Sequence, residues 1–533
     1  SSDVCSSDLP FASEILVGCT MTAEILLGTK GLSAHDVITI ARNGAKIKIT
    51  DDAVAAMKRS RVIIDEISKS ETPVYGVSTG FGALAREFID ADKRAQLQRS
   101  LIRSHAAGSG TPVEIEVVRA MMSLRLATIC RGYSGVKPET AQVYAAILNS
   151  GLTPVVREYG SLGCSGDLAP LSSCALVAMG EGEVIDLTGA IVPTKDALSK
   201  VGVKPVELSS KEGLALINGT DGMLGQLVMA ISDIRALLKC LDIAAAMSVE
   251  ALMGTDRVFQ EHLHAIRPQI GQQASAKNLE VMLSESPMVK SHAGSEDHRV
   301  QDAYSLRCAP QVAGAARDTL AHAETIALRE LSSIIDNPIV MPTGEISSNG
   351  NFHGAPVAHV LDFLAISLAD VASISERRTD NMLDVHRSDG LTPFLAQDPG
   401  VDSGMMIAQY TQAALVSEMK RLAAPASVDS IPSSAMQEDH VSMGWHAARK
   451  LRRSIDAFAQ VIGIELMIAA RAIEMRAPLK ASPATSAALA EIRTRVAGPG
   501  HDRWLSPEIT DCVELVRSGK ILSAVEKEVG ALL

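Results

Sequence analysis

The chain has 533 residues, with 50 basic and 62 acidic side chains and a formal net charge of −12, and this acidic balance without a basic block argues against nucleic acid as a partner. Hydrophobic residues make up 47% of the chain but aromatic residues only 3%, so aliphatic side chains and the 20 methionines must fill the core. Because these residues favour or tolerate helices, the composition predicts an all-α, mainly helical protein.

The N-terminal segment differs from the rest of the chain. Residues 1–20 lack the basic region and the cleavage site of a secretory signal, and Met21 follows them directly. We interpret residues 1–20 as a non-native leader or cloning scar. Further on, a short β-prone run at Lys46–Thr50 precedes a helical pattern at Asp51–Ile67.

Two glycine-rich segments interrupt the helical periodicity that follows. Residues Val74–Gly82 hold three glycines within seven positions, too many for the interior of a helix or strand. Helical patterns resume at Ala91–Ser104 and Val113–Arg131, and the segment Tyr159–Leu171 breaks them again with glycines and a proline. Both glycine-rich segments are therefore predicted to be loops.

Long amphipathic patterns dominate the C-terminal half, after a stretch at Val184–Val206 that predicts small β-hairpins. Apolar residues in Leu361–Arg378 recur at spacings of three and four, and Ser442–Arg476 would form about ten helical turns. Helices of this length usually pack as a bundle. We expect an N-terminal domain at 21–220 and a helical bundle with C-terminal helices at 221–533.

Several function classes find no support in the sequence. The eight cysteines show no CxxC pair or regular spacing, which favours a reducing cytoplasm over a disulfide framework or a zinc site. Charges interrupt every apolar stretch, so we expect no membrane span. Histidines at 262, 264, 292, 298 and 353 form no HExxH pair, and no GxGxxG or GK[ST] motif is present, so neither metal nor nucleotide is expected.

The pentapeptide Gly-Cys-Ser-Gly-Asp at 163–167 is by itself compatible with a tight turn ending in an Asp cap. Five further segments accompany it in a fixed order: YGVSTGFG at 75–82, LQRSLIRSHAAG at 97–108, LALINGT at 214–220, QDAYSLRCAPQ at 301–311 with NFH at 351–353, and PASVDSIPSSAMQEDHVSMG at 425–444. Together they resemble the histidine, phenylalanine and tyrosine ammonia-lyases over nearly the whole chain after Met21. The resemblance implies an ammonia-lyase/fumarase-like architecture, with a loop-bearing N-terminal domain before a long central helical bundle.

The resemblance also implies a cofactor made from the backbone. In that family an Ala-Ser-Gly tripeptide cyclises to 4-methylidene-imidazol-5-one (MIO), and the matching residues here are Cys164, Ser165 and Gly166. The amide nitrogen of Gly166 would attack the carbonyl of Cys164, and Ser165 would lose its hydroxyl as water. Cys164 departs from the usual alanine, but ring closure does not consume its side chain. Asp167 would either assist closure or act as a helix N-cap.

Elimination of an amine requires a placed base and an electron sink. The resemblance places the base on Tyr75, whose pKa would have to be lowered by its surroundings. It assigns the substrate carboxylate to Arg307, with Asn218 and Tyr304 beside it, and it places Phe352 near the ring. Without the accompanying motifs, these residues would be read as packing residues and a solvated surface charge.

Two further motifs indicate which substrate side chain the site would bind. The pair Ser104 and His105 is typical of histidine ammonia-lyases, and His105 can exchange a hydrogen bond with an imidazole or with a phenol hydroxyl. Gln437 and Glu438 lie in the QED segment, where a carboxylate would pair with an imidazolium and gain nothing from a phenyl group. These motifs favour L-histidine, with trans-urocanate as the product.

Other interpretations stay open. Met419 and Met436 stand where many histidine enzymes have Asn, and Asp221 follows NGT where Gln is frequent, so a tyrosine ammonia-lyase forming p-coumarate is an alternative. An MIO-dependent aminomutase and a non-catalytic relative on the same scaffold are two more. For the assembly, the resemblance implies a cytoplasmic homotetramer that binds a small aromatic amino acid at active sites shared by three chains.

Overall fold

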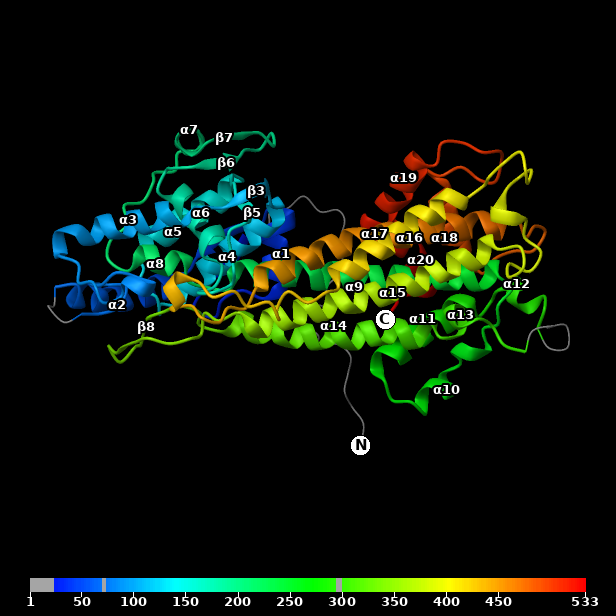
Figure 1. The fold of residues 1–533 in the computed structure, drawn as a ribbon, viewed down its shortest axis with the longest axis horizontal. Helices are drawn as coiled ribbons and strands as arrows, with labels where there is room; N and C mark the ends of the chain where they lie inside the picture. The colour runs from blue at the N-terminus through cyan, green and yellow to red at the C-terminus, as the bar shows by residue number, and fades with distance from the viewer. Residues whose placement is uncertain (1–23, 70–72, 294–299) are drawn as a thin grey trace. The chain divides into compact units, whose positions relative to one another are not determined.

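The computed structural model describes residues 24–69, 73–293 and 300–533, so the interpretation of residues 1–20 and His298 lie outside the described residues. Most described residues are helical, and the strands are short and form sheets of two or three strands. Strand β1 (Glu24–Leu27) pairs in parallel with β2 (Lys46–Ile49), whereas the other strand pairs are antiparallel. The predicted mainly helical class is confirmed (Figure 1).

Contacts within the chain divide it into two compact units. Unit 1 contains the chain up to Met229 together with Glu324–Asp362 and Pro425–Arg449. After β1 and β2, its helices and strands in the first segment are α1 (Ala34–Asn43), α2 (Asp51–Ile67), α3 (Arg94–His105), β3 (Ser109–Pro112), α4 (Ile115–Cys130), α5 (Pro138–Ser150), β4 (Thr153–Pro154), β5 (Arg157–Tyr159), α6 (Leu168–Ala178), β6 (Glu183–Ile185), β7 (Ile191–Pro193), α7 (Thr194–Lys200) and α8 (Glu212–Ile217). The short strands β8 (Ile339–Val340) and β9 (Ile346–Ser347) and the 3-10 turns η1 (Gly82–Leu84), η2 (Ala91–Lys93) and η6 (Ser434–Met436) complete it.

Unit 2 contains Ala230–Ala323, Phe363–Ala424 and Lys450–Leu533. Its own elements are η3 (Arg257–Phe259), α10 (Glu261–Ala265), α11 (Ile270–Leu283), α12 (Pro287–Lys290), α13 (Tyr304–Arg307), η5 (Pro393–Leu395), α16 (Met406–Leu422), α18 (Pro483–Arg493), α19 (Ser506–Arg517) and α20 (Lys520–Val529). Four long helices contribute residues to both units: α9 (Asp221–Ala251), α14 (Ala309–Ser332), α15 (Ala355–Leu383) and α17 (Gly444–Glu474). This division differs from the predicted one, in which two contiguous domains meet near residue 220. The segments Glu324–Asp362 and Pro425–Arg449 belong to unit 1 although they follow that boundary in the sequence.

The core of unit 1 is built around α4. Every residue of this helix from Val117 to Cys130 is buried, including Arg119 and Arg125, so the helix has no solvent-exposed face over this range. It packs against α1 and α5, and α3, α6 and α8 contact one another in the same unit (Figure 1). Ser104 and His105 end α3, the tripeptide 164–166 precedes α6, and Asn218 follows α8, so these three helices position several of the predicted site residues.

Local predictions agree with the structure except in one stretch. The helix at Asp51–Ile67 is confirmed as α2, and Ser442–Arg476 contains α17. Within Val184–Val206, β6 and β7 form a single hairpin, but the residues after it form α7 and not a second hairpin. Pro193 at the N-cap position and Asp196 in the first turn favour this helix start.

One described helix, α15, is long and apolar enough to cross a membrane by length and composition. Within its apolar window, 61% of the residues are buried inside the protein, as in a core helix. The expectation of no membrane span stays a prediction.

Candidate active site

The tripeptide Cys164-Ser165-Gly166 lies in the loop between β5 and α6, and its backbone is pressed against the chain that follows α8. Gly166 has a φ of +78° and pairs with Gly219, while the Asp167 N–H donates to the Gly219 carbonyl at 2.8 Å. A Cβ atom at position 166 would lie 2.0 Å from the Gly219 oxygen. Only glycine fits this position, because both the left-handed backbone and the close approach exclude a side chain.

The carboxylate of Glu438 connects this loop to the QED segment. One oxygen, Oε1, accepts a hydrogen bond from Ser165 Oγ at 3.0 Å, and the other accepts from Ser433 Oγ at 3.0 Å. The intervening η6 residues all have left-handed φ angles of 50° to 68° although none is glycine. Such strain persists only where the surrounding structure holds it, and it is concentrated at functional sites.

Tyr75 lies in the first glycine-rich loop and is partly buried. Its phenol oxygen accepts a hydrogen bond from the Gly82 N–H at 3.3 Å, and its ring packs edge-on against Phe81 at 6.5 Å between centroids. Burial raises the pKa of Tyr75, and the charge of Glu438 raises it further, while the Gly82 hydrogen bond opposes both. The expected lowering of the Tyr75 pKa is therefore wrong for the single chain, because no cation among the described residues offsets desolvation.

Ser104 and His105 end α3. Ser104 Oγ lies 3.0 Å from His105 Nδ1 and also donates to the Leu101 carbonyl. Burial lowers the pKa of His105, although the Leu101 carbonyl and the charge of Glu438 raise it in part. His105 is thus held as a neutral imidazole that can both donate and accept a hydrogen bond.

Asn218 follows the last residue of α8 and is held at both its backbone and its side chain. Arg125 Nη1 donates to the Asn218 carbonyl at 2.8 Å, and Asn218 Nδ2 donates to the Asn337 carbonyl at 2.9 Å. The side chain is 2% exposed. Within the described residues, its amide oxygen Oδ1 has no hydrogen-bond partner. A buried acceptor of this kind is available to a bound ligand.

The remaining predicted residues do not join this cluster through described contacts. Phe352 is half-buried in the turn before α15, and Gln437 is exposed beside Glu438. Tyr304 and Arg307 belong to unit 2, where the guanidinium lies 4.5 Å from the Tyr304 ring centroid and its Nε donates to the Asp302 carbonyl at 3.1 Å. The structure therefore gathers Tyr75, Ser165 and Glu438 with their neighbours in unit 1 and leaves the Arg307 pair in unit 2.

Comparison with known proteins identifies the family. A profile described as aromatic amino acid lyase matches residues 32–494. The chain belongs to this family. Relatives named histidine ammonia-lyase from Streptomyces avermitilis and Streptomyces coelicolor are 60% and 58% identical, and each alignment covers 95% of this chain and 99% of the relative.

Solved structures of the family show the same fold. The histidine ammonia-lyase of Trypanosoma cruzi superimposes with a TM-score of 0.87 at 37% identity, covering 95% of this chain and 96% of the other. The tyrosine aminomutase of Streptomyces globisporus has a TM-score of 0.90 at 35% identity, covering 95% and 99%. Members of this family in general depend on MIO, and the chain is a carbon–nitrogen lyase.

The tripeptide in this chain fits an MIO group. Gly166 has no side chain to obstruct its amide nitrogen, Ser165 supplies a hydroxyl that can leave as water, and the Cys164 side chain takes no part in closure. Burial, with the nearby charge of Glu438, raises the pKa of the Cys164 thiol to about 12, so the thiol stays protonated and is a poor nucleophile against the ring. The substitution of alanine by cysteine is thus chemically compatible with the family's cofactor.

Asp167 stands at the N-cap position of α6, but its side chain makes no capping bond there. Instead it accepts from Ser161 Oγ at 2.9 Å and from the Met223 N–H at 2.8 Å. Burial raises its pKa to about 7, so near neutral pH the carboxyl can both hold and release a proton beside Gly166. These observations favour the interpretation in which Asp167 assists closure over the N-cap interpretation.

The Asp167→Asn variant should mature slowly. Asn keeps the acceptor for Met223 but cannot exchange a proton, so most molecules should lack the mass deficit of two water molecules that closure and dehydration leave in the loop peptide. Mass spectrometry of that peptide measures the matured fraction. Asp242→Asn, which removes a buried carboxyl with a raised pKa in unit 2, is the matched control and should mature fully. Full maturation of Asp167→Asn would remove Asp167 from the closure step.

Sequence reasoning missed the polar groups behind the site. Arg125 is fully buried and binds the carbonyls of Asn218 and Ile335, and Lys211 and Asp336 form a fully buried ion pair. Ser433, which holds the second oxygen of Glu438, was also not singled out. A signal was available for Arg125, which is a cation inside an apolar segment, where a charge requires partners.

Proposed function

We propose that the protein is a histidine ammonia-lyase, which eliminates ammonia from L-histidine to give trans-urocanate. The observation that carries this proposal is the position of Glu438, whose carboxylate binds Ser165 and acts electrostatically on both His105 and Tyr75. This position beside the tripeptide supports a role for Glu438 as the acceptor of an imidazole N–H. The 60% identity to a histidine ammonia-lyase over nearly the full chain supports the same substrate.

The reaction needs an electron sink and a base. An MIO group formed from Cys164, Ser165 and Gly166 would supply an electrophile that makes the amine a better leaving group or the β-proton more acidic. Tyr75, as phenolate, accepts the proton from the β-carbon and becomes a neutral phenol, and the Gly82 N–H stabilises the phenolate before the transfer. The electrons of the C–H bond become the new double bond, and those of the C–N bond leave with ammonia.

Two groups would recognise the substrate ring, the neutral imidazole of His105 and the carboxylate of Glu438. His105 is neutral, so it can donate to one imidazole nitrogen or accept from it without charge repulsion. Glu438 accepts the N–H of the ring and stabilises the imidazolium form. A phenyl ring has no N–H to donate to Glu438, so it would displace solvent from the carboxylate without replacing the lost hydrogen bond, which costs binding free energy.

The substrate carboxylate is assigned to Arg307, supported by the Tyr304 ring beneath its guanidinium. We place this pair in the site of a neighbouring copy within a cytoplasmic homotetramer, because the family resemblance implies active sites shared by three chains. A guanidinium brought next to Tyr75 in this way would also lower the Tyr75 pKa that burial raises in the single chain. Asn218, with Phe352 and Gln437, completes the proposed binding groups.

A tyrosine-specific lyase or an aminomutase would use the same fold. The similarity to the tyrosine aminomutase is 35% in identity, well below the 60% and 58% shared with the histidine ammonia-lyases. We therefore favour the lyase that acts on histidine. Product analysis separates the three outcomes, because only a mutase returns the amine to the β-carbon.

The variant Glu438→Gln tests whether Glu438 binds the imidazole ring of the substrate. Gln keeps one acceptor oxygen for a serine hydroxyl, and its NH₂ group can donate to the other hydroxyl, but it loses the charge. We therefore expect kcat/KM for histidine to fall about 10- to 100-fold, as for a lost charge-assisted hydrogen bond. Turnover of phenylalanine should not fall. Asp439→Asn removes the same charge at the adjacent exposed residue and should leave kcat/KM for histidine nearly unchanged. Equal losses of kcat/KM for histidine and phenylalanine would show that Glu438 does not recognise the imidazole ring.

A further inference from the structure

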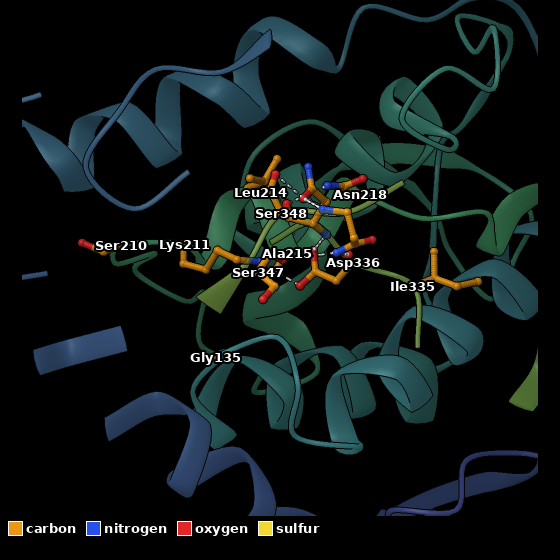
Figure 2. A network of polar contacts seen from close by, with 12 residues as sticks. Gly135, Ser210, Lys211, Leu214, Ala215, Asn218, Ile335, Asp336, Ser347 and Ser348 are labelled. Carbon is orange, nitrogen blue, oxygen red and sulfur yellow. Dashed lines mark hydrogen bonds and ion pairs between the residues drawn. The ribbon is translucent and has the colours of Figure 1, made fainter. Parts of the chain in front are cut away.

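A fully buried ion pair lies behind the proposed site. Lys211 Nζ and Asp336 Oδ2 are 2.8 Å apart, and both side chains have no exposed surface (Figure 2). Lys211 immediately precedes α8, and Asn218 immediately follows it. Replacing a buried pair by apolar residues is often neutral or stabilising, so stability alone does not explain why the pair is present. Lys211 also has a left-handed φ of 72°, which adds a conformational cost.

Asp336 connects Lys211 to Asn337, because one carboxylate oxygen binds Lys211 and the other binds the Asn337 backbone. Its second oxygen, Oδ1, accepts from the Asn337 N–H at 2.8 Å. The Asn337 side chain is held as well, because its Oδ1 accepts from Ser348 Oγ at 3.0 Å and from the Asn349 N–H at 2.9 Å. The Asn337 peptide and side chain are therefore both held by hydrogen bonds.

The fixed Asn337 carbonyl determines which way the Asn218 amide faces. A carbonyl oxygen only accepts hydrogen bonds, so the Asn218 NH₂ group must face it, as the 2.9 Å contact shows. The amide oxygen of Asn218 is then turned away from Asn337. It is buried, and no described residue donates to it. Its unused acceptor capacity calls for a donor from a ligand.

Asn218 is also adjacent to the reacting loop. The next residue, Gly219, pairs with Gly166 and accepts the Asp167 N–H. A displacement of the Asn218 segment would therefore change the geometry beside Ser165, where a shift of about 1 Å can cost roughly 100-fold in rate.

We infer that the Lys211–Asp336 pair is a positioning pair: it holds the Asn337 carbonyl so that Asn218 presents its amide oxygen to the ammonium group of the bound amino acid. The inference rests on the proposed function, which supplies the ammonium-bearing substrate. Three successive hydrogen bonds connect Lys211 to Asn218 through Asp336 and Asn337, and so restrict the position of the Asn218 side chain. The pair itself does not touch the substrate.

A double-mutant cycle tests the inference. The charge-free variant Lys211→Met/Asp336→Leu is made in the wild-type protein and in an Asn218→Ala background. In the wild-type background, we expect the double replacement to lower kcat/KM for histidine on the order of 10- to 100-fold. The loop peptide should keep its mass deficit of two water molecules, because the pair does not take part in ring closure. In the Asn218→Ala background the same replacement should cause no further loss, because the pair acts only through Asn218.

Control variants separate positioning from general destabilisation. Arg317→Met/Asp242→Leu removes another buried ion pair, in unit 2, and its loss in kcat/KM should be the same with and without Asn218. The inference is overturned if the Lys211–Asp336 losses are additive with Asn218→Ala, if the charge-free variant has wild-type kcat/KM, or if it fails to fold, since the pair would then serve stability. An inactive wild-type protein would instead reject the proposed function and the inference with it.

Discussion

Replacing Ser165 by alanine should abolish turnover, with a fall in kcat of roughly a thousandfold or more, because the electron sink is made from this hydroxyl. Alanine cannot lose water to form a methylidene group, so the loop peptide should also lack the dehydration. The fold should survive, because before ring closure the variant lacks only the hydrogen bond from Ser165 to Glu438, worth about 1 kcal/mol, and the closed ring has no hydroxyl there either. Turnover by ultraviolet absorbance, peptide mass and thermal unfolding are the three measurements.

Ser433→Ala is the matched control for Ser165→Ala. It removes the other hydroxyl that donates to Glu438, at the same distance of 3.0 Å, but it leaves the tripeptide intact. We expect full maturation and a much smaller loss of activity. If Ser165→Ala kept the wild-type rate, the chain would not use an electrophile derived from this residue, and the proposed mechanism would fail.

Tyr75→Phe should have the second largest effect, a fall in kcat of about 10²- to 10⁴-fold, the usual contribution of a general base. Phenylalanine keeps the edge-on packing against Phe81, so folding and maturation should be unaffected. Only the oxygen that accepts from Gly82 is lost. Maturation is checked by peptide mass, so a loss of rate can be assigned to the proton transfer alone.

The pH dependence gives a second signature of Tyr75. Its pKa in the single chain is raised above the ordinary value of about 10, so near neutral pH the phenol holds its proton and cannot act as a base. As pH rises, the phenolate fraction increases, and kcat/KM should increase with it until the pKa in the assembled enzyme is reached. This rise should be absent from the residual activity of Tyr75→Phe. An identical profile in the variant would assign the base to another group.

The sequence predicted the class of fold and the segments that meet at the site. Ser165 and Glu438 are 273 residues apart and belong to two of the motifs on which the resemblance was based, and their side chains share a hydrogen bond. Motif residues could be found because their chemistry restricts which side chains are usable. Their catalytic roles stay predictions that the variants above test.

The supporting contacts could not be predicted in the same way. Lys211 and Asp336 are 125 residues apart, and nothing in the local pattern of either residue indicates which partner it has. The Tyr75 pKa depends on burial and on the distance to Glu438, which are properties of the folded chain. The return of Glu324–Asp362 and Pro425–Arg449 to unit 1 was missed because amphipathic periodicity does not show where a long helix changes neighbours.

The most direct test of the account is the product that the purified protein forms from L-histidine, measured beside separate reactions with L-tyrosine and L-phenylalanine. We predict that histidine yields urocanate and ammonia in equal amounts, and that kcat/KM is highest for histidine. Formation of p-coumarate from tyrosine with a higher kcat/KM, a β-amino acid in place of urocanate, or no product from any of the three would contradict the assignment of this chain as a histidine ammonia-lyase.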